Sequence, residues 1–424
     1  MNERNWLAGF AALCLGQFLA HQTALSFSAL MPILGHEWHL TASRAGLILG
    51  GFQLGQLGAY VAVGFLLDRM RTKPIMVASA AMVATGDLLF ALGARDFLSG
   101  LLLRVLAGSL LGGLYLPALK HIAETTPRVR RGVATGVYVG VSVGAYAAPL
   151  LYVGLLAPHI GWRATMGLVG FLELLGALVM AGLVPDVPRP ALPERAGFSR
   201  YAKDVLENRA ARRIILAYTA HNWELFGMWT WIGPFMVASL GARGSPPREA
   251  LLWGGTLAAI VVGLGGGLGA AAGGYLSDRV GRARAATLAL GISLPCSLVF
   301  GWLFHAPLAL AAVAGALYGT VAVADSPAYS ASLMEAVPAR SLGGAFSIQM
   351  LLGWAATAVA PAAFGLTLDV VQTAQREPAV AWGAAFAILA AGPLVGVIAL
   401  APLRAAGPDR LGRKVEMRRG PADT

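Results

Sequence analysis

Stretches of about 20 mostly apolar residues recur along nearly the whole chain of 424 residues. An α-helix needs about 20 such residues to cross the hydrocarbon core of a bilayer. Hydrophobic residues make up 57% of the sequence and charged residues only 12%, a balance that a fully water-exposed surface does not tolerate. The sequence therefore predicts an all-α membrane protein that crosses the bilayer many times.

Twelve spans can be counted between charged or Pro/Gly-rich breaks. They cover residues 6–32, 44–67, 74–94, 97–121, 132–155, 162–184, 214–240, 250–276, 285–304, 307–333, 342–368 and 380–403. We predict an N-terminal six-helix bundle (1–184), a cytoplasmic linker with a surface helix (185–213), a C-terminal six-helix bundle (214–403) and a basic cytoplasmic tail (404–424).

The lysines and arginines predict which side of the membrane carries the termini. If both termini and every second loop lie on one side, that side holds 25 of the 32 Lys and Arg residues. By the positive-inside rule this side is cytoplasmic, which predicts an inner-membrane protein with both ends in the cytoplasm. Since the basic residues lie between apolar runs and form no basic face, we expect no nucleic-acid partner. Cys14 and Cys296 lie far apart within apolar runs, so we expect no disulfide framework, metal site or cofactor.

The two halves repeat three landmarks at an almost constant spacing. Such a repeat predicts two similarly oriented bundles with a solute site between them near the bilayer midplane. The pairs are Gly64-Phe-Leu-Leu-Asp68-Arg69 with Gly274-Tyr-Leu-Ser-Asp278-Arg279 (offset 210), Glu124…Pro127 with Glu335…Pro338 (offset 211), and Pro149 with Pro361 (offset 212).

The first of these repeats resembles the loop signature of the major facilitator superfamily, Gly-x-x-x-Asp-Arg-x-Gly-Arg-x-Arg. The second copy has Gly274, Asp278, Arg279, Gly281, Arg282 and Arg284, whereas the first keeps Gly64, Asp68, Arg69 and Lys73 but has Arg71 at the glycine position. The resemblance covers essentially the whole chain. It implies a monomeric secondary transporter with twelve transmembrane helices in two pseudo-symmetric six-helix bundles.

In that family the signature closes the cytoplasmic side. A glycine near the membrane edge lets two helices approach, and an aspartate there can lie against the positive N-terminal end of a neighbouring helix. The resemblance implies span 11 as the partner of the first copy and span 5 as the partner of the second. The alternative is that the aspartates are merely interfacial charges. The predicted gate consists of Gly64, Asp68, Arg69, Gly274, Asp278, Arg279, Gly281 and Arg282.

Two further patterns resemble motifs of proton-coupled members. Arg104-x-x-x-Gly108 in span 4 is similar to their intramembrane arginine motif. Span 5 carries Gly136, Gly140 and Gly144, similar to the glycine-rich fifth helix of drug/proton antiporters, but it lacks their Gly-Pro pair. Small-residue packing between helices is the alternative explanation of these glycines.

Charged side chains inside the spans are expensive and are therefore functional candidates. They are Asp87, Arg104, Glu173, Glu224 and Asp325, of which Asp87 and Glu173 are also compatible with structural roles. In span 7 a candidate acid shares one helical face with a histidine, a methionine and a tryptophan. The predicted solute and proton cavity consists of Gln17, His21, Gln22, Gln53, Gln56, Arg104, Tyr115, His221, Glu224, Met228, Trp231, Tyr318, Asp325 and Tyr329. Both histidines are equally compatible with plain burial against neighbouring carbonyls.

These features favour secondary active transport of a small solute by alternating access, with protons as the coupling ion and Glu224 or Asp325 as the proton carrier. An enzyme is not expected, since a metal-ligand pattern such as His-Glu-x-x-His is absent, and the chain has no Gly-Lys-Ser/Thr phosphate loop for ATP-driven transport. A drug or metabolite efflux antiporter, an uptake carrier for small organic or inorganic anions, and a non-transporting receptor remain alternatives. Nitrate- or oxalate-like anions are disfavoured, because carriers of such anions in this family commonly have basic residues in both halves of the cavity, whereas this chain has Arg104 in the first half and none in the second.

Overall fold

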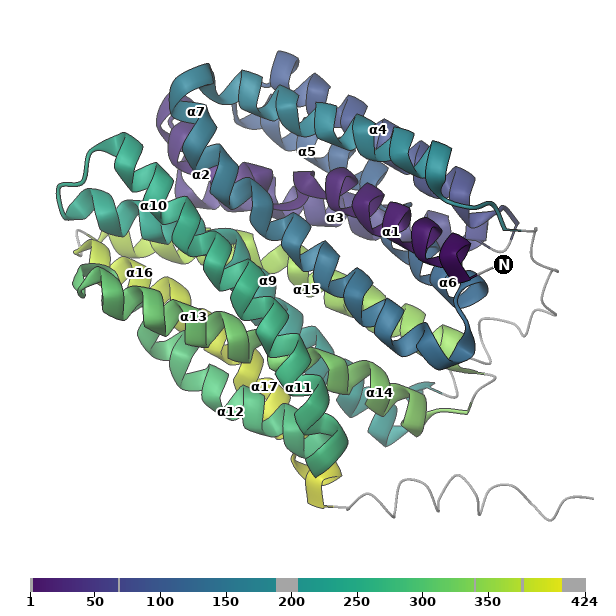
Figure 1. The fold of residues 1–424 in the computed structure, drawn as a ribbon. Helices are drawn as coiled ribbons and strands as arrows, with labels where there is room; N and C mark the ends of the chain where they lie inside the picture. The colour runs from purple at the N-terminus through teal and green to yellow at the C-terminus, as the bar shows by residue number, and fades with distance from the viewer. Residues whose placement is uncertain (1–2, 68, 188–204, 339–340, 375–376, 406–424) are drawn as a thin grey trace, which may run out of the picture.

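The computed structural model describes residues 3–67, 69–187, 205–338, 341–374 and 377–405, almost all of them helical (Figure 1). The first half contains α1 (Glu3–Ala20), η1 (Gln22–Leu25), α2 (Ser26–Glu37), α3 (Ala42–Leu67), α4 (Thr72–Gly93), α5 (Phe97–Leu111), α6 (Tyr115–Thr125), η2 (Arg128–Arg130) and α7 (Arg131–Leu183). The second half contains α9 (Arg209–Ala242), α10 (Pro247–Ala259), η3 (Ile260–Gly265), α11 (Gly266–Val280), α12 (Arg282–Phe300), η4 (Gly301–His305), α13 (Leu308–Ala324), α14 (Ser326–Ala336), α15 (Leu342–Thr373), α16 (Pro378–Ala387), η6 (Ile388–Ala390) and α17 (Ala391–Ala405).

Helix α7 contains two of the predicted spans. It has 53 residues, and a continuous helix of this length would be about 80 Å long, more than twice the hydrocarbon thickness of about 30 Å. Gly161 breaks it with a φ of 80°, a conformation that glycine adopts readily because it lacks a Cβ. Eleven helices in the described part of the chain are long and apolar enough to cross a membrane. Since α7 crosses twice, the predicted all-α fold with twelve spans is confirmed.

Spans 4 and 10 are interrupted at equivalent points of the two halves. Residues 112–114 separate α5 from α6, and Asp325 alone separates α13 from α14. In the second half Pro327 lies in the first turn of α14, where its missing N–H cannot continue the helical ladder. In the first half the N–H of Gly113 donates to the hydroxyl of Ser79 at 3.1 Å. The breaks follow the internal repeat, as expected for two bundles of the same design.

Helix α9 begins inside the segment that we expect to be the linker. Its first residue is Arg209, because the Asn208 side chain accepts hydrogen bonds from the N–H groups of Ala210 (3.0 Å) and Ala211 (3.1 Å). An asparagine in this position satisfies backbone donors that have no partner within the helix. Residues 188–204 of the linker, where we expect the surface helix, and 406–424 of the basic tail lie outside the described residues.

The two bundles are joined at one end of the molecule, which we call the closed end. There the Asp369 carboxylate of α15 accepts hydrogen bonds from the N–H groups of Ala42 and Ser43 at the start of α3, both at 2.8 Å. A carboxylate at a helix N-terminus is favourable because it meets free N–H donors and the positive end of the helix dipole. This contact ties the second half to the first.

Glycines bring the helix backbones of the two halves together at the closed end. A Cβ at Gly50 of α3 would collide with the carbonyl oxygen of Ala358 in α15. In the same way, a Cβ at Gly255 of α10 would collide with the carbonyl oxygen of Leu150 in α7. In lipid, helix association depends on such close contact because apolar surface gains little by leaving hydrocarbon.

Toward the other end, which we call the open end, the same helix pairs separate. By helical spacing, Gly64 of α3 and Gly343 of α15 lie on the faces that these two helices turn toward each other. Gly132 and Gly136 lie on the corresponding inward face of α7. At all four positions no described atom lies within 4 Å of the place where a Cβ would sit. The N-terminus lies at this end in Figure 1. The two bundles therefore meet at the closed end and diverge toward the termini.

Replacing Gly50 by alanine tests the closed-end contact. We expect Gly50→Ala to destabilise the purified protein by about 1–3 kcal/mol, as overpacking does in tightly packed interiors. Gly58→Ala on the same helix is the matched control, because no described atom lies within 4 Å of its Cβ position. The measurement is the melting temperature of both variants in detergent, and equal values would show that Gly50 does not set the helix separation.

Candidate solute and proton sites

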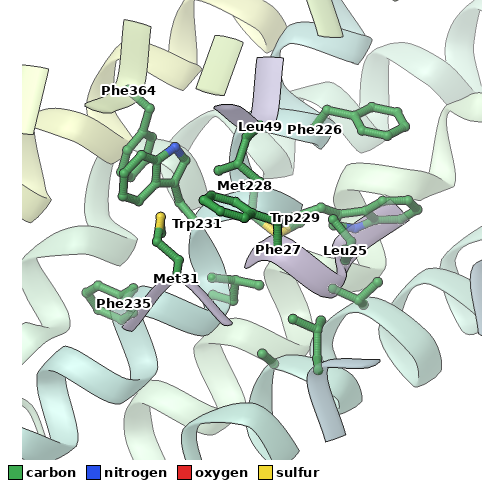
Figure 2. Packing of buried hydrophobic residues seen from close by; sticks show 14 of the residues in the cluster. Leu25, Phe27, Met31, Leu49, Phe226, Met228, Trp229, Trp231, Phe235 and Phe364 are labelled. Carbon is green, nitrogen blue, oxygen red and sulfur yellow. The ribbon is translucent and has the colours of Figure 1, made fainter. Parts of the chain in front are cut away.

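A layer of packed apolar side chains lies between the halves (Figure 2). Trp231 donates its indole N–H to the carbonyl of Pro361 at 3.0 Å and stacks on Phe364, with ring centroids 5.0 Å apart. Met228 is completely buried. Two residues of the predicted cavity thus lie in this layer, which we call the apolar plug. It consists of Phe27, Met31, Met228, Trp231, Phe235 and Phe364.

Five aromatic side chains from both halves form a continuous layer beside the plug, the central aromatic layer. Tyr146 of α7 lies 5.5 Å from Trp229, and Trp229 lies 5.5 Å from Phe226, both in α9. Phe226 lies 5.4 Å from Trp354 of α15, which in turn lies 5.1 Å from Tyr60 of α3. Beyond this layer α3 and α15 diverge, so it forms the floor of the space that faces the open end.

Polar groups of span 1 adjoin this floor. The His21 ring lies 5.2 Å from Tyr146, and His21 Nδ1 is 2.8 Å from Gln17 Nε2. Gln17 also donates to the Ser142 hydroxyl at 3.1 Å. His21 Nε2, Gln17 Oε1 and Trp229 Nε1 are buried and have no hydrogen-bond partner among the described residues. Because buried polar groups are nearly always satisfied, these three atoms are candidates for binding a solute.

Ser142 also matches a spacing that is known from hydrolases. The sequence Gly140-Val-Ser142-Val-Gly144 has the Gly-x-Ser-x-Gly form of a nucleophile elbow. That chemistry requires a sharp strand-to-helix turn, whereas Ser142 lies within α7 and donates to the Tyr138 carbonyl at 3.0 Å. The match therefore gives no indication of an active site.

The second half contains a network around His221 and Asp325, which the sequence places in the cavity. His221 Nδ1 lies 2.8 Å from Asp325 Oδ1, and the Tyr329 hydroxyl donates to Asp325 Oδ2 at 2.7 Å. His221 Nε2 is 2.8 Å from the hydroxyl of Ser326. The break between α13 and α14 places Asp325 and Ser326 beside α9. Histidine and aspartate are thus paired within one bundle.

Glu224 lies in a separate pocket between α9, α12 and α13. Its Oε1 accepts hydrogen bonds from Ser293 at 2.5 Å and Ser297 at 2.6 Å, and Ser297 is 2.8 Å from the Tyr318 hydroxyl. The carboxyl is buried, its Oε2 has no partner among the described residues, and His221 is the base one helical turn away. The serines were not among the predicted residues, although their i, i+4 spacing in span 9 is a usable sequence signal.

Arg104 is buried in the first half. Its guanidinium donates to the Thr23 hydroxyl at 2.8 Å and the Thr23 carbonyl at 2.7 Å, forms an ion pair with Asp87 at 3.2 Å, and lies 4.3 Å from the centre of the Phe52 ring. Gly108 completes the motif, since a Cβ there would collide with the Phe52 backbone of α3. The side chain is 1% exposed, so the guanidinium interacts only with groups of its own bundle among the described residues.

The remaining predicted cavity residues are dispersed. The Gln22 side chain donates to the Phe18 carbonyl at 2.5 Å. Gln53 is buried with Oε1 unpartnered among the described residues, and Gln56 donates to Tyr60 at 2.9 Å. The Tyr115 ring lies 5.9 Å from that of Tyr138. Of these, the Gln56–Tyr60 pair belongs to the floor of the open space.

Among the gate residues that the structure describes, none bridges the two halves in this conformation. Arg282 pairs with Asp278 and with Glu335, the latter at 3.3 Å, and Arg279 lies 4.4 Å above the Tyr275 ring. All three partners belong to the second half. The inward face near Gly274 meets only Pro327, at 4.0 Å from the Cβ position. Asp68 lies outside the described residues; Gly64 and Arg69 are exposed.

The two gate loops differ for a conformational reason. Gly281 has a φ of 92°, which disfavours any residue with a Cβ, whereas Arg71 in the equivalent place has a φ of −67° and needs no glycine. Arg71 instead pairs with Asp186 after α7 at 2.7 Å, and this hydrogen bond lowers the pKa of the Asp186 carboxyl. The first loop is thus held by an ion pair within its own half.

Comparison with known proteins places this arrangement in a family. The family model of the Major Facilitator Superfamily matches residues 13–361. The chain belongs to the major facilitator superfamily, whose members transport small solutes, and this confirms the resemblance seen in the sequence. No group of three or more His, Cys, Asp or Glu side chains in the described part of the chain is arranged to hold a metal.

Two relatives and one solved structure illustrate the similarity. The chain is 26% identical to a probable sulfoacetate transporter of Cupriavidus necator, over 71% of each chain. It is 25% identical to a gentisate transporter of Corynebacterium glutamicum, over 84% of this chain and 81% of the relative. It shares its fold with an inward-facing, unoccupied bacterial homologue of the human lysosomal transporter Spinster, with a TM-score of 0.72, 18% identity and full coverage of both chains.

Proposed function

We propose that this protein is a proton-coupled secondary transporter that moves a small organic carboxylate by alternating access. One observation carries the proposal: the halves are tied together at the closed end and separate at the open end, and unpartnered polar atoms lie at the floor between them. In this proposal a solute approaches that floor from the open end. A rocking motion of the two bundles about the floor would close the open end and expose the floor at the closed end.

The open end faces the cytoplasm in this proposal, because the positive residues of the chain concentrate on the side of the termini. The Spinster homologue that shares the fold is described as inward-facing, which agrees with this orientation. The protein would then lie in the inner membrane with both termini inside.

Cysteine labelling tests the orientation. In a background without Cys14 and Cys296, Val129→Cys at the open end should react with an impermeant maleimide only after cells are permeabilised, because Val129 is 96% exposed on the cytoplasmic side. Glu249→Cys, in the first turn of α10 at the closed end, should react in intact cells. The reverse pattern would invert the proposed topology.

The site favours a solute with both a flat or apolar part and a carboxylate. The central aromatic layer provides ring faces for the apolar part. Trp229 and His21 supply nearby hydrogen-bonding nitrogens for an acidic group. Sulfoacetate and gentisate, the solutes named for two relatives, both carry a carboxylate. Because Arg104 is committed within its bundle, small inorganic anions have no free arginine to bind.

Counterflow in proteoliposomes tests transport and solute class together. Liposomes preloaded with an unlabelled aromatic or short sulfonated carboxylate should take up the labelled form transiently, whereas liposomes preloaded with nitrate should not. We expect Trp229→Ala to reduce this exchange at least tenfold, because stacking and an N–H donor are both lost. Binding in a thermal-shift assay without counterflow would indicate a receptor, and exchange of neutral solutes alone would exclude the proposed class.

Glu224 is the proposed proton carrier, because it is a buried carboxyl held by two hydroxyl groups and by no Lys or Arg among the described residues. Glutamine preserves its shape but cannot titrate. Glu224→Gln should therefore abolish accumulation driven by a pH gradient, while exchange of labelled for unlabelled solute survives. Glu249→Gln, at an exposed position, is the control. If Glu224→Gln accumulates solute like the wild type, Asp325 becomes the next candidate.

A further inference from the structure

Span 1 is not a continuous helix, and its break is bound by charged side chains of other helices. The chain leaves α1 after Ala20, forms the 3₁₀ turn η1, and resumes as α2 at Ser26. Thr23 lies within the turn. Its N–H donates to Glu173 Oε1 of α7 at 3.1 Å, and its carbonyl and hydroxyl oxygens both accept from Arg104 of α5. The shape of the turn therefore depends on the two ionisable side chains that hold it.

The charges of this cluster do not balance if every group is ionised. Arg104 is the single cation, whereas Asp87 pairs with it at 3.2 Å and Glu173 lies beside Asp87. All three residues are at most 1% exposed. Asp87 Oδ2 and Glu173 Oε2 have no hydrogen-bond partner among the described residues. Two carboxylates and one guanidinium would leave an uncompensated negative charge in a fully buried region.

Among the described residues, the neighbours of the cluster offer no second cation. Phe52 and Phe90 cover the guanidinium, with its carbon 4.3 Å and 5.9 Å from their ring centres. Tyr152 of α7 is the other titratable group near both acids, and its buried hydroxyl has no partner among the described residues. Thr23 and Ser26 contribute neutral hydroxyl groups. One proton shared by the two carboxyl groups is the simplest way to remove the excess charge.

We propose that Asp87 and Glu173 form a proton-binding site that controls the 3₁₀ turn of span 1, an inference that rests on the proposed transport function. With one proton bound, an O–H of one carboxyl donates to the other, the cluster is neutral, and Glu173 and Arg104 hold Thr23 as observed. Loss of that proton leaves two adjacent carboxylates, which repel each other and compete for Arg104. The contacts that fix the turn are then weakened.

This turn is placed to act on the solute site. His21 lies two residues before Thr23, contacts Tyr146 of the central aromatic layer, and carries one of the unpartnered atoms at the floor. A change in the turn therefore changes how His21 is presented between the bundles. Proton binding in the first half would set the position of a solute-facing residue, independently of Glu224 in the second half.

Infrared spectroscopy of the purified protein at neutral pH detects the shared proton directly. The wild type should show the C=O stretch of a protonated carboxylic acid that is lost in Glu173→Gln and in Asp87→Asn, since each variant leaves one carboxylate balanced by Arg104. The band should persist in Glu224→Gln, the matched control in the second half. Its persistence in both first-half variants, or its loss only in Glu224→Gln, would overturn the proposal.

A conformational measurement tests the control of span 1. Spin labels at Val129→Cys and Met334→Cys, exposed sites on the open-end side of each half, report the separation of the bundles. The distance distribution of the wild type should shift between mildly acidic and mildly alkaline pH. Glu173→Gln and Asp87→Asn should lose this shift, and Glu224→Gln should keep it. An unchanged shift in both first-half variants, or none in the wild type, would contradict the proposal.

Both measurements work without a solute, so they separate this inference from the proposed function. If no carboxylate gives counterflow but the infrared and distance results are as predicted, the carboxylate proposal is contradicted. The proton site is then still supported. Normal counterflow without the infrared band would contradict the proton site alone. Because either isosteric variant tests the same pair, a folding defect in one still leaves the other as a test.

Discussion

The structure depends above all on the high cost of leaving polar groups unsatisfied in a lipid-surrounded interior. Helices satisfy the backbone, and ionisable side chains are then accepted only where a partner is at hand. Each half solves this problem within its own bundle. Arg104 is bound by Thr23 and Asp87 in the first half, and His221 is bound by Asp325 in the second. The two bundles can therefore separate without leaving a buried charge unpaired.

The internal repeat produces a similar but unequal pair of polar clusters. Each half contains one cluster of two buried carboxyl groups and one base, but the base of the cluster is an arginine in the first half and a histidine in the second. An arginine stays charged, whereas a histidine can lose its charge near neutral pH. The first cluster is Asp87, Glu173 and Arg104, and the second is Glu224, Asp325 and His221. The halves thus share an architecture while their ionisable sites have different chemistry.

The contact between the halves follows a different principle. At the closed end it is made by glycines against backbone carbonyls and by Asp369 at the start of α3, whereas at the open end no described atom lies within 4 Å of the Cβ positions of Gly64, Gly132, Gly136 and Gly343. Backbone contacts of this kind are tight but involve few charged groups. They can therefore be broken, and replaced by contacts at the other end of the bundles, at a modest cost in free energy. The gate residues Asp278 and Arg282 are meanwhile paired with residues of their own half.

Much of this architecture can be predicted from the sequence, because the thickness of the bilayer dictates how long and how hydrophobic each span must be. The repeat spacing and the loop signature indicated two bundles and the family, and both are confirmed. The face shared by His221, Glu224, Met228 and Trp231 was also visible from helical spacing. Helical spacing gives the direction of a side chain around its own helix. It does not say which neighbouring helix the side chain will meet.

The tertiary structure alone decided those partners. Along one face of α9, His221 meets α14, Glu224 meets α12, and Trp231 meets α15, because the helix crosses several neighbours along its length. Glu173 reaches Thr23 across 150 residues of sequence, a contact that no local pattern contains. The sequence by itself determined how many helices cross the membrane and which residues must be shielded from lipid. Only packing decided which residues shield one another, since that depends on where the helices cross.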